Sequence, residues 1–105
     1  MLNQSENTVR KTFDAFIEKF MKCWYRAVPC SVVSIDNRCH IDETMIIRVN
    51  WYVCGKEYHC NKLIHYGEFE MIRGIDGVLE HTIKTLYNEY NMSLLGKAVN
   101  YDNDN

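Results

Sequence analysis

The chain has few residues that interrupt regular structure and few patterns that mark a chemical site. Pro29 is the only proline among 105 residues. No apolar run approaches the roughly 18–20 residues that span a bilayer. No two cysteines have the CxxC spacing found in many zinc sites, and no catalytic or cofactor motif stands out. We therefore expect no membrane span, no cofactor and no enzyme activity.

The chain also lacks a strong excess of either charge. Twelve basic and 14 acidic residues give a formal net charge of −2, which excludes a global basic field that would draw the chain onto nucleic acid or an anionic membrane. The charges are unevenly spread, with nine basic and seven acidic residues in 1–64 but three basic and seven acidic residues in 65–105. Such an asymmetry can orient a partner or another copy of the chain.

A charged-then-apolar leader with a small-residue cleavage site is not recognisable at the start of the chain. The five cysteines are Cys23, Cys30, Cys39, Cys54 and Cys60. An odd number without a leader argues against a disulfide framework, so we expect free thiols and a reducing, intracellular, cytoplasmic setting. The abundance of Asn, Ile, Lys and Tyr is typical of an AT-rich genome, such as those of many phages and Gram-positive hosts.

What the sequence does contain is a long hairpin pattern from Ile46 to Tyr66. Glycine is preferred at the first central position of a type II′ turn, so a Gly55-Lys56 turn is predicted. The predicted cross-strand pairs are Cys54 with Glu57, Val53 with Tyr58, Trp51 with Cys60, and Ile47 with Ile64.

This turn sorts the hairpin side chains onto two faces, because successive residues of a strand point to opposite sides. The packed face is expected to hold Ile47, Val49, Trp51, Val53, Tyr58, Cys60 and Ile64. The face that meets water or a partner is expected to hold Arg48, Asn50, Tyr52, Cys54, Glu57, His59, Asn61 and His65.

Two amphipathic helices are predicted on either side of the hairpin in the chain. Apolar residues spaced by three and four run from Val9 to Val28, and Pro29 ends this helix of about five turns. A second series over residues 75–90 predicts another helix, with Asp76 as its cap and Asn91 as its end. An earlier start of that helix, within residues 68–73, stays open.

A short β-branched run at residues 31–35 predicts a first strand, and residues 36–43 are expected to form the loop to the hairpin. The predicted fold class is α+β: a three-stranded antiparallel β-meander with a long N-terminal helix and a C-terminal helix packed on one face, in the order α-β-β-β-α. Residues 1–99 are expected to form a single compact domain, and residues 100–105 a polar acidic tail.

Cysteine and histidine, the usual ligands of structural zinc, occur at Cys39, His40, Cys54, His59, Cys60 and His65. The predicted faces separate them, because Cys60 points into the core. His59 and His65 lie six residues apart on one strand, roughly 20 Å, too far to share an ion. Cys54 and His59 are expected as diagonal neighbours, so a site completed by Cys39 or His40 stays open. Our prediction is nevertheless that no metal is bound.

Two catalytic interpretations are weaker than their structural alternatives. The loop could present an acid/base or cation cluster formed by His40, Asp36, Asp42 and Glu43. An exposed loop supplies neither a pocket nor a shifted pKa by itself. A cysteine nucleophile needs a neighbouring histidine and an orienting group, and only Cys54 and His59 are expected to come close.

The polar face of the hairpin is the best candidate for binding, because it joins tyrosine, arginine and amide side chains on a sheet with no helix over it. The predicted contact residues are Arg48, Tyr52, His59, Asn61 and His65, together with Glu80 and Glu89 on the acidic face of the last helix. Such a face could also stack and hydrogen-bond single-stranded nucleic acid.

The order helix, three strands, helix resembles the double-stranded-RNA-binding domain in topology. That family carries a run of lysines at the start of its last helix, which grips phosphates. The matching stretch here, IDGVLEHTIKTLYNEY, is acidic with Lys84 as its single lysine, so duplex RNA binding is not expected.

A second resemblance rests on the segment IIRVN (Ile46 to Asn50) followed by Gly55, Glu57 and Tyr58, with an acidic aromatic helix behind it. This pattern is similar to that of small phage-encoded anti-CRISPR inhibitors, some of which are compact helix, three-strand, helix proteins. The resemblance implies a phage or mobile-element protein that binds and inhibits a host factor.

The expected function is therefore non-catalytic protein–protein interaction, with a host factor as partner. Two alternatives stay open: a homo-oligomeric structural or virion assembly component, and RNA or single-stranded nucleic-acid binding through the open sheet face.

Overall fold

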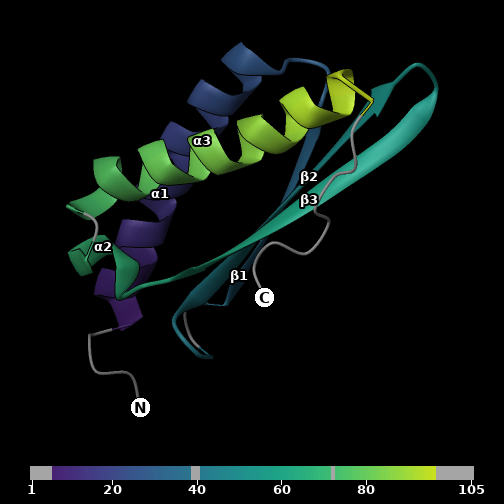
Figure 1. Ribbon diagram of the computed structural model, residues 1–105. Coiled ribbons are helices and arrows are strands. Elements are labelled where there is room, and N and C mark those ends of the chain that lie inside the picture. Colours follow the sequence, from purple (N-terminus) through teal and green to yellow (C-terminus); the bar gives the residue numbers. More distant parts are fainter. Residues whose placement is uncertain (1–5, 39–40, 72, 97–105) are drawn as a thin grey trace.

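The computed structural model describes residues 6–38, 41–71 and 73–96 and has an α+β architecture in two layers (Figure 1). One layer is a three-stranded antiparallel sheet in the order β1-β2-β3. The other layer consists of helices that cover one side of that sheet. The elements are α1 (Glu6–Ala27), β1 (Val32–Arg38), β2 (Thr44–Val53), β3 (Lys56–His65), α2 (Glu68–Met71) and α3 (Gly74–Leu94). The predicted fold class and element order are confirmed.

Helix α1 forms because its apolar residues recur every three or four positions and face the sheet. The buried positions are Val9, Phe13, Phe16, Phe20 and Trp24, followed by Val28 just after the helix. The turn at Pro29 is held by Ser31, whose backbone N–H and hydroxyl both donate to the carbonyl of Val28, at 3.2 and 2.8 Å. The hydroxyl of Ser31 also accepts a hydrogen bond of 2.7 Å from the indole N–H of Trp24. The predicted helix and its end before Pro29 are confirmed, and it begins at Glu6, before the predicted series.

Strand β1 is longer than the sequence pattern indicated. Residues 36–38, predicted as part of a loop, continue the strand and pair with residues 44–46 of β2. Aspartate and asparagine are poor strand formers, so their local preference favoured a loop. The ladder to β2 overrides that preference, because a neighbouring strand supplies hydrogen-bond partners for their backbone groups.

The predicted faces of the hairpin are confirmed, but its predicted register is wrong by two residues. Trp51 pairs with Tyr58 and Val49 pairs with Cys60, whereas the Gly55-Lys56 turn would have paired Trp51 with Cys60. The turn residues are instead Cys54 and Gly55. A shift of two leaves the side chains of the strands on their predicted faces, because the side-chain period of a strand is two residues. Cys54, predicted on the polar face, lies in the turn instead.

The reason for the shift is the backbone of the turn itself. Cys54 and Gly55 have φ values of 51° and 80°, and two consecutive positive φ values are the signature of a type I′ turn. The prediction assumed a type II′ turn, in which only the first central residue has positive φ. Cysteine is uncommon in the left-handed region, which asparagine and glycine enter more readily, so the sequence carried no usual I′ signal.

Helix α3 starts earlier and ends later than predicted, and Asp76 is not its cap. It begins at Gly74. Arg73, just before the helix, and Gly74 itself have positive φ values of 53° and 76°. Asp76 lies in the first turn, where its carboxylate accepts from Lys19 Nζ of α1 at 3.0 Å. Asn91 does not end the helix, which continues to Leu94. The separate short helix α2 accounts for the helical pattern seen before residue 74.

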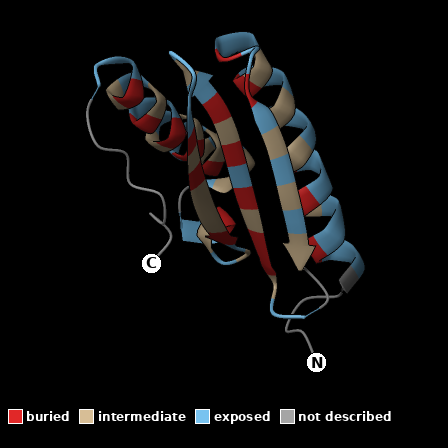
Figure 2. Ribbon diagram, turned by 90° about the vertical axis from the view of Figure 1, so that its right-hand side faces the viewer, coloured by how far each residue is buried: buried red, intermediate tan, exposed pale blue. Residues whose placement is uncertain are grey.

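The core lies between the two layers, and its red buried positions run along the inner faces of the helices and the central strand (Figure 2). Aromatic rings fill much of it: Phe20 stacks between Phe16 and Trp24, with ring centroids 6.2 and 6.0 Å away. Trp51 of β2 stacks on Tyr58 of β3 at 6.1 Å and meets Tyr90 of α3 edge-on at 5.8 Å. The described helices do not combine the length and apolar character that crossing a bilayer requires.

Replacing Cys54 by asparagine is expected to stabilise the protein by roughly 0.5–1 kcal/mol, because asparagine tolerates positive φ better than cysteine. Urea unfolding of Cys54→Asn against the parent chain measures this difference. Cys23→Asn, the same change at an exposed helical site, is the control and is expected to give no gain. A loss of stability in Cys54→Asn would instead support a strand position for this residue, where asparagine is disfavoured.

Replacing Ser93 by alanine is expected to destabilise the protein by about 1–3 kcal/mol, because it leaves a buried indole N–H without an acceptor. That N–H belongs to Trp51 and donates to Ser93 Oγ at 2.7 Å. Thermal and urea unfolding of Ser93→Ala measure the cost.

Thr82→Val is the matched control on the same helix. The hydroxyl of Thr82 is buried and has no hydrogen-bond partner among the described residues, so its removal is expected to be neutral or stabilising. Equal losses of stability in the two variants would show that the hydrogen bond from Trp51 to Ser93 does not contribute to stability.

Candidate functional site

The side of the sheet that points away from the helices is the main candidate site, and we call it the open face. Its side chains follow from the strand pairing, since residues directly opposite each other point to the same side. The open face consists of Val32, Ser34 and Asp36 of β1; Ile46, Arg48, Asn50 and Tyr52 of β2; and Glu57, His59, Asn61, Leu63 and His65 of β3.

The structure brings the five sheet residues predicted from the sequence onto this one face. Arg48 lies opposite Asn61 on one side and Ser34 on the other, so these three side chains form a row across the sheet. His59 lies in the next row, opposite Asn50, and Tyr52 lies beyond it opposite Glu57. Tyr52 is 64 % exposed.

The fifth predicted sheet residue lies at the far end of this face. His65 ends β3 opposite Thr44, and its backbone N–H donates to Glu68 Oε2 at 2.8 Å. Glu68 begins α2. The histidine therefore belongs to the junction between sheet and helix, at the opposite end of the face from Tyr52.

A shallow hollow of 370 Å³ lies on the open face over β1, β2 and β3, lined by Ser34, Ile35, Asp36, Ile46, Arg48 and Asn61. Its polar groups are a guanidinium, a carboxylate, a hydroxyl and an amide, and Ile46 adds an apolar side chain from the open face. Arg48 and Asp36 are both exposed, and neither forms an ion pair within the described part of the chain.

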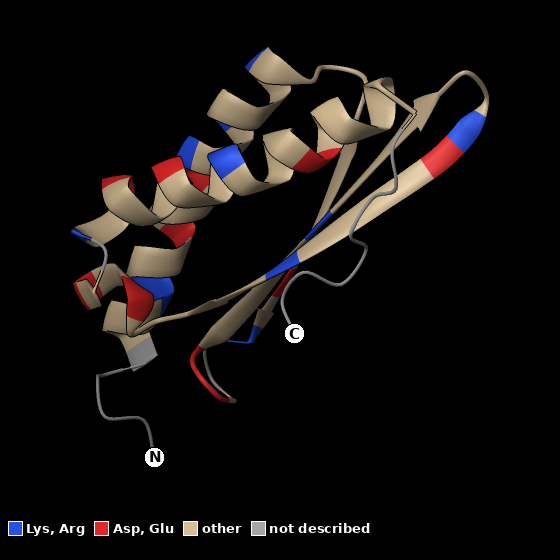
Figure 3. Ribbon diagram, in the orientation of Figure 1, with Lys and Arg blue, Asp and Glu red and all other residues tan. Residues whose placement is uncertain are grey.

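The two predicted acidic contact residues lie on α3, in the other layer of the molecule. Glu80 is exposed there. The placement of Glu89 on an exposed acidic face is wrong, because this residue is only 7 % exposed. Helix α1 carries both basic and acidic residues, whereas α3 carries Lys84 as its one lysine among Asp76, Glu80 and Glu89 (Figure 3). A single partner would have to reach both sides of the protein to contact Glu80 and the open face together.

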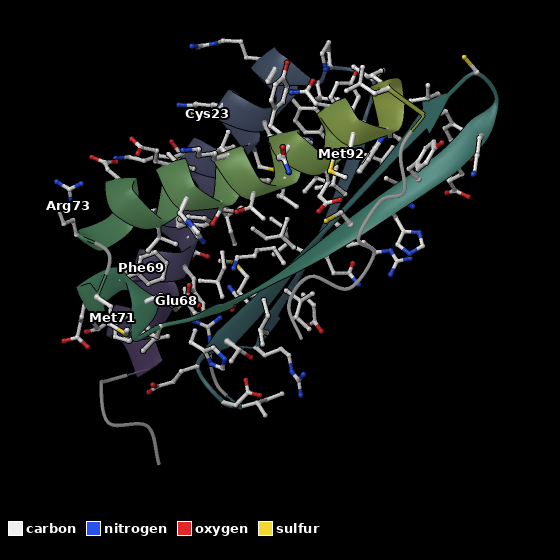
Figure 4. All side chains as sticks on the ribbon, in the orientation of Figure 1. Cys23, Glu68, Phe69, Met71, Arg73 and Met92 are labelled. Atoms are coloured by element: carbon white, nitrogen blue, oxygen red, sulfur yellow. The ribbon has the colours of Figure 1, made fainter. Side chains whose placement is uncertain are left out.

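A second concave surface, which sequence reasoning missed, lies between α1 and α3. This helix groove has a volume of 460 Å³, and its apolar lining comes from Cys23, Ala27, Leu79, Ile83 and Tyr87. Figure 4 shows Cys23 on α1, where that helix passes behind α3. The spacing of four residues between the two α1 positions, and again along α3, was the available signal.

The structure removes the proposed closeness of Cys54 and His59. Cys54 is a turn residue and His59 pairs with Asn50, so they lie four strand positions apart, or roughly 13 Å. Cys60 is buried, as predicted. Among the described residues, no three His, Cys, Asp or Glu side chains are grouped so that they could hold a metal ion. Cys39 and His40 lie outside the described residues.

The carboxylates of the predicted loop cluster lie on different elements in this fold. Asp36 lies on β1, and Asp42 accepts a short hydrogen bond from the hydroxyl of Thr44. This bond and the nearby Arg38 guanidinium, 3.9 Å away, lower the pKa of Asp42 below its ordinary value. Glu43 turns the chain into β2 with a φ of 57°, and its carbonyl accepts from the N–H of Tyr66 at 2.9 Å.

Comparison with known proteins adds no relative: no family model, no curated protein and no solved structure matches this chain. Its function is therefore argued from the geometry of its surfaces.

Replacing Thr44 by valine is expected to raise the pKa of Asp42 toward its ordinary value, because it removes the strongest group that favours the ionised carboxylate. A carboxyl with a lowered folded-state pKa stabilises the protein above its unfolded pKa. That contribution is lost as the pH falls through the folded pKa. Thr44→Val is therefore expected to reduce the loss of folding stability that protonation of Asp42 causes in acid.

An NMR titration of the Asp42 side-chain carboxyl measures the change. The control is Ser34→Ala, a change in the same sheet but away from Asp42 and Thr44. It is expected to leave the titration of Asp42 unchanged. An unaltered midpoint in Thr44→Val would contradict the assignment of the pKa shift to the Thr44 hydroxyl.

Proposed function

We propose that this protein is a small non-catalytic protein–protein interaction module that binds its partner through the open face. The observation that carries the proposal is the exposure of Tyr52 and Arg48 on the side of the sheet away from the described helices. Tyrosine and arginine are enriched where protein interfaces lose the most free energy on truncation.

The central strand gives these two side chains a fixed backbone. Strand β2 pairs with β1 on one side and with β3 on the other, over seven and ten residue pairs. Its packed face holds Met45, Ile47, Val49 and Trp51 in the core. A rigid backbone lowers the loss of conformational entropy on binding. Strand β2 is therefore suited to carry a contact surface.

The geometry of the reactive side chains favours binding over catalysis. A cysteine nucleophile requires a histidine within hydrogen-bond reach. In this fold Cys54 lies in the turn, Cys60 lies in the core, and His59 lies opposite Asn50. These positions separate Cys54 from His59, the thiol and histidine that the sequence predicted to lie close together.

The finer proposal is a phage or mobile-element protein that inhibits a host factor. Its support is the resemblance of the hairpin and the last helix to small anti-CRISPR inhibitors. The thiols of Cys23, Cys30 and Cys54 are free, which suits a reducing, cytoplasmic place of action.

Binding of single-stranded nucleic acid remains an alternative prediction for the same face. Tyr52 offers a ring for stacking and Arg48 a cation. The carboxylates of Asp36 and Glu57 share the face and would repel phosphates, so protein is the favoured partner.

Alanine at Tyr52 and at Arg48 is expected to abolish capture of the partner. Each truncation is expected to weaken binding by at least about tenfold, since central tyrosine and arginine residues commonly cost more than 1–2 kcal/mol. The measurement is affinity capture from the source cell with mass spectrometry, followed by titration of the captured protein against each variant.

The matched controls are Tyr87→Ala and Lys84→Ala, which remove an exposed tyrosine and a cation from the helix layer. They are expected to retain capture. Retention by the open-face variants together with loss in the controls would move the binding site to the helix groove. Retention of RNA or single-stranded DNA that falls steeply with salt would replace the protein partner by nucleic acid.

A further inference from the structure

The open face carries one cation and one anion in the same hollow, and neither is paired with another charge of the described residues. Arg48 of β2 and Asp36 of β1 both line it, yet no ion pair joins them. Elsewhere some exposed charges are paired within the chain, for example Lys19 with Asp76 at 3.0 Å and Lys22 with Glu18 at 3.5 Å. The two charges of the hollow are thus available to a group from outside the chain.

The strand register fixes how these two charges lie relative to each other. Ser34 is opposite Arg48 and Asp36 is opposite Ile46. The four side chains therefore form a rectangle on the open face, with two corners on β1 and two on β2. Arg48 and Asp36 occupy one diagonal of that rectangle, and Ser34 and Ile46 occupy the other.

A surface with this arrangement is complementary to itself. Consider two copies with their open faces toward each other and a two-fold axis midway between the two sheets, parallel to the Ser34–Ile46 diagonal. Rotation about this axis exchanges the positions of Arg48 and Asp36. It places Arg48 of each copy over Asp36 of the other, and Ile46 over Ile46. Isologous dimers are built in this reciprocal way, with one patch serving both subunits.

Apolar side chains around the hollow supply area that such a contact would bury. Val32 is 63 % exposed, while Ile46 and Leu63 are partly exposed on the same face. Sheets that pack face to face bury side chains of this kind between layers about 10 Å apart.

We propose that the open face binds a second copy of this chain, sheet against sheet, with Arg48 of each copy paired to Asp36 of the other. This inference rests on the proposed function, because it takes the open face as the contact surface; it makes a second copy of the chain the partner there, in place of a host factor. The helices of both copies then form the outer layers of the dimer.

Charge reversal at the two positions tests the pairing. Arg48→Glu places a glutamate opposite Asp36, and Asp36→Arg places an arginine opposite Arg48, so each variant alone replaces both attractive pairs by repulsive ones. Light scattering across a concentration series is expected to show a dimeric parent chain and a dimer dissociation constant raised at least about tenfold in each variant.

An equimolar mixture of the two variants is the decisive measurement. In a heterodimer the introduced glutamate of one copy faces the introduced arginine of the other, and the retained Arg48 faces the retained Asp36. Both ion pairs return, so the mixture is expected to dimerise again. The double variant, D36R together with R48E, is expected to dimerise alone for the same reason. Circular dichroism of each variant establishes that it is folded.

Controls on the helix layer are Glu80→Arg and Lys84→Glu, which are expected to leave the mass unchanged. A monomeric parent chain at millimolar concentration, or single variants that stay dimeric, would overturn the inference, as would a mixture that stays monomeric. If the parent chain is monomeric but Tyr52→Ala still loses capture of another protein, self-association fails and the proposed function stands.

Discussion

The hydrogen bond from the Trp51 indole to Ser93 is the contact on which the arrangement of the two layers depends. It joins the central strand to the last turns of α3, 42 residues later in the chain. Ser93 in turn donates to the carbonyl of Tyr90 at 2.6 Å, and Tyr90 meets the Trp51 ring edge-on. The second tryptophan, Trp24, uses the same arrangement with Ser31. In both cases a serine lets a large apolar ring be buried without leaving its N–H unpaired.

Anchoring α3 on the Trp51 side has a direct consequence for the other side of the sheet. The hydrogen bond and ring contacts of Trp51 fix α3 on that face, and α1 packs beside α3 in the same layer. The side chains of β2 then alternate between the buried core and the open face, where Arg48 and Tyr52 are exposed. The open face is thus a product of one-sided packing, and the central strand that carries it is held by paired neighbours on both edges.

Several features of this site could be predicted from the sequence, and others could not. Alternation along the hairpin placed Arg48, Tyr52, His59, Asn61 and His65 on one face, and this was correct despite a register error of two residues. The same error predicted Cys54 as a neighbour of His59, which left a metal or nucleophile site open, whereas the observed turn separates the two residues. Glu89 has the polarity of a surface residue but is buried. The hollow between Asp36 and Arg48 needed β1 to extend through residues that do not favour strands.

The sequence by itself determined which side each residue takes, because the periods of two and about 3.6 residues are local properties of the chain. It also determined α1, whose apolar stripe and following proline lie within one segment. Only the tertiary structure decided the register of the hairpin, the length of β1, the end of α3 at Ser93–Leu94 and the exposure of Glu89. Each of these depends on hydrogen bonds or packing between segments that are distant in the chain, or on backbone angles at a turn such as Cys54–Gly55 that residue preferences alone do not indicate.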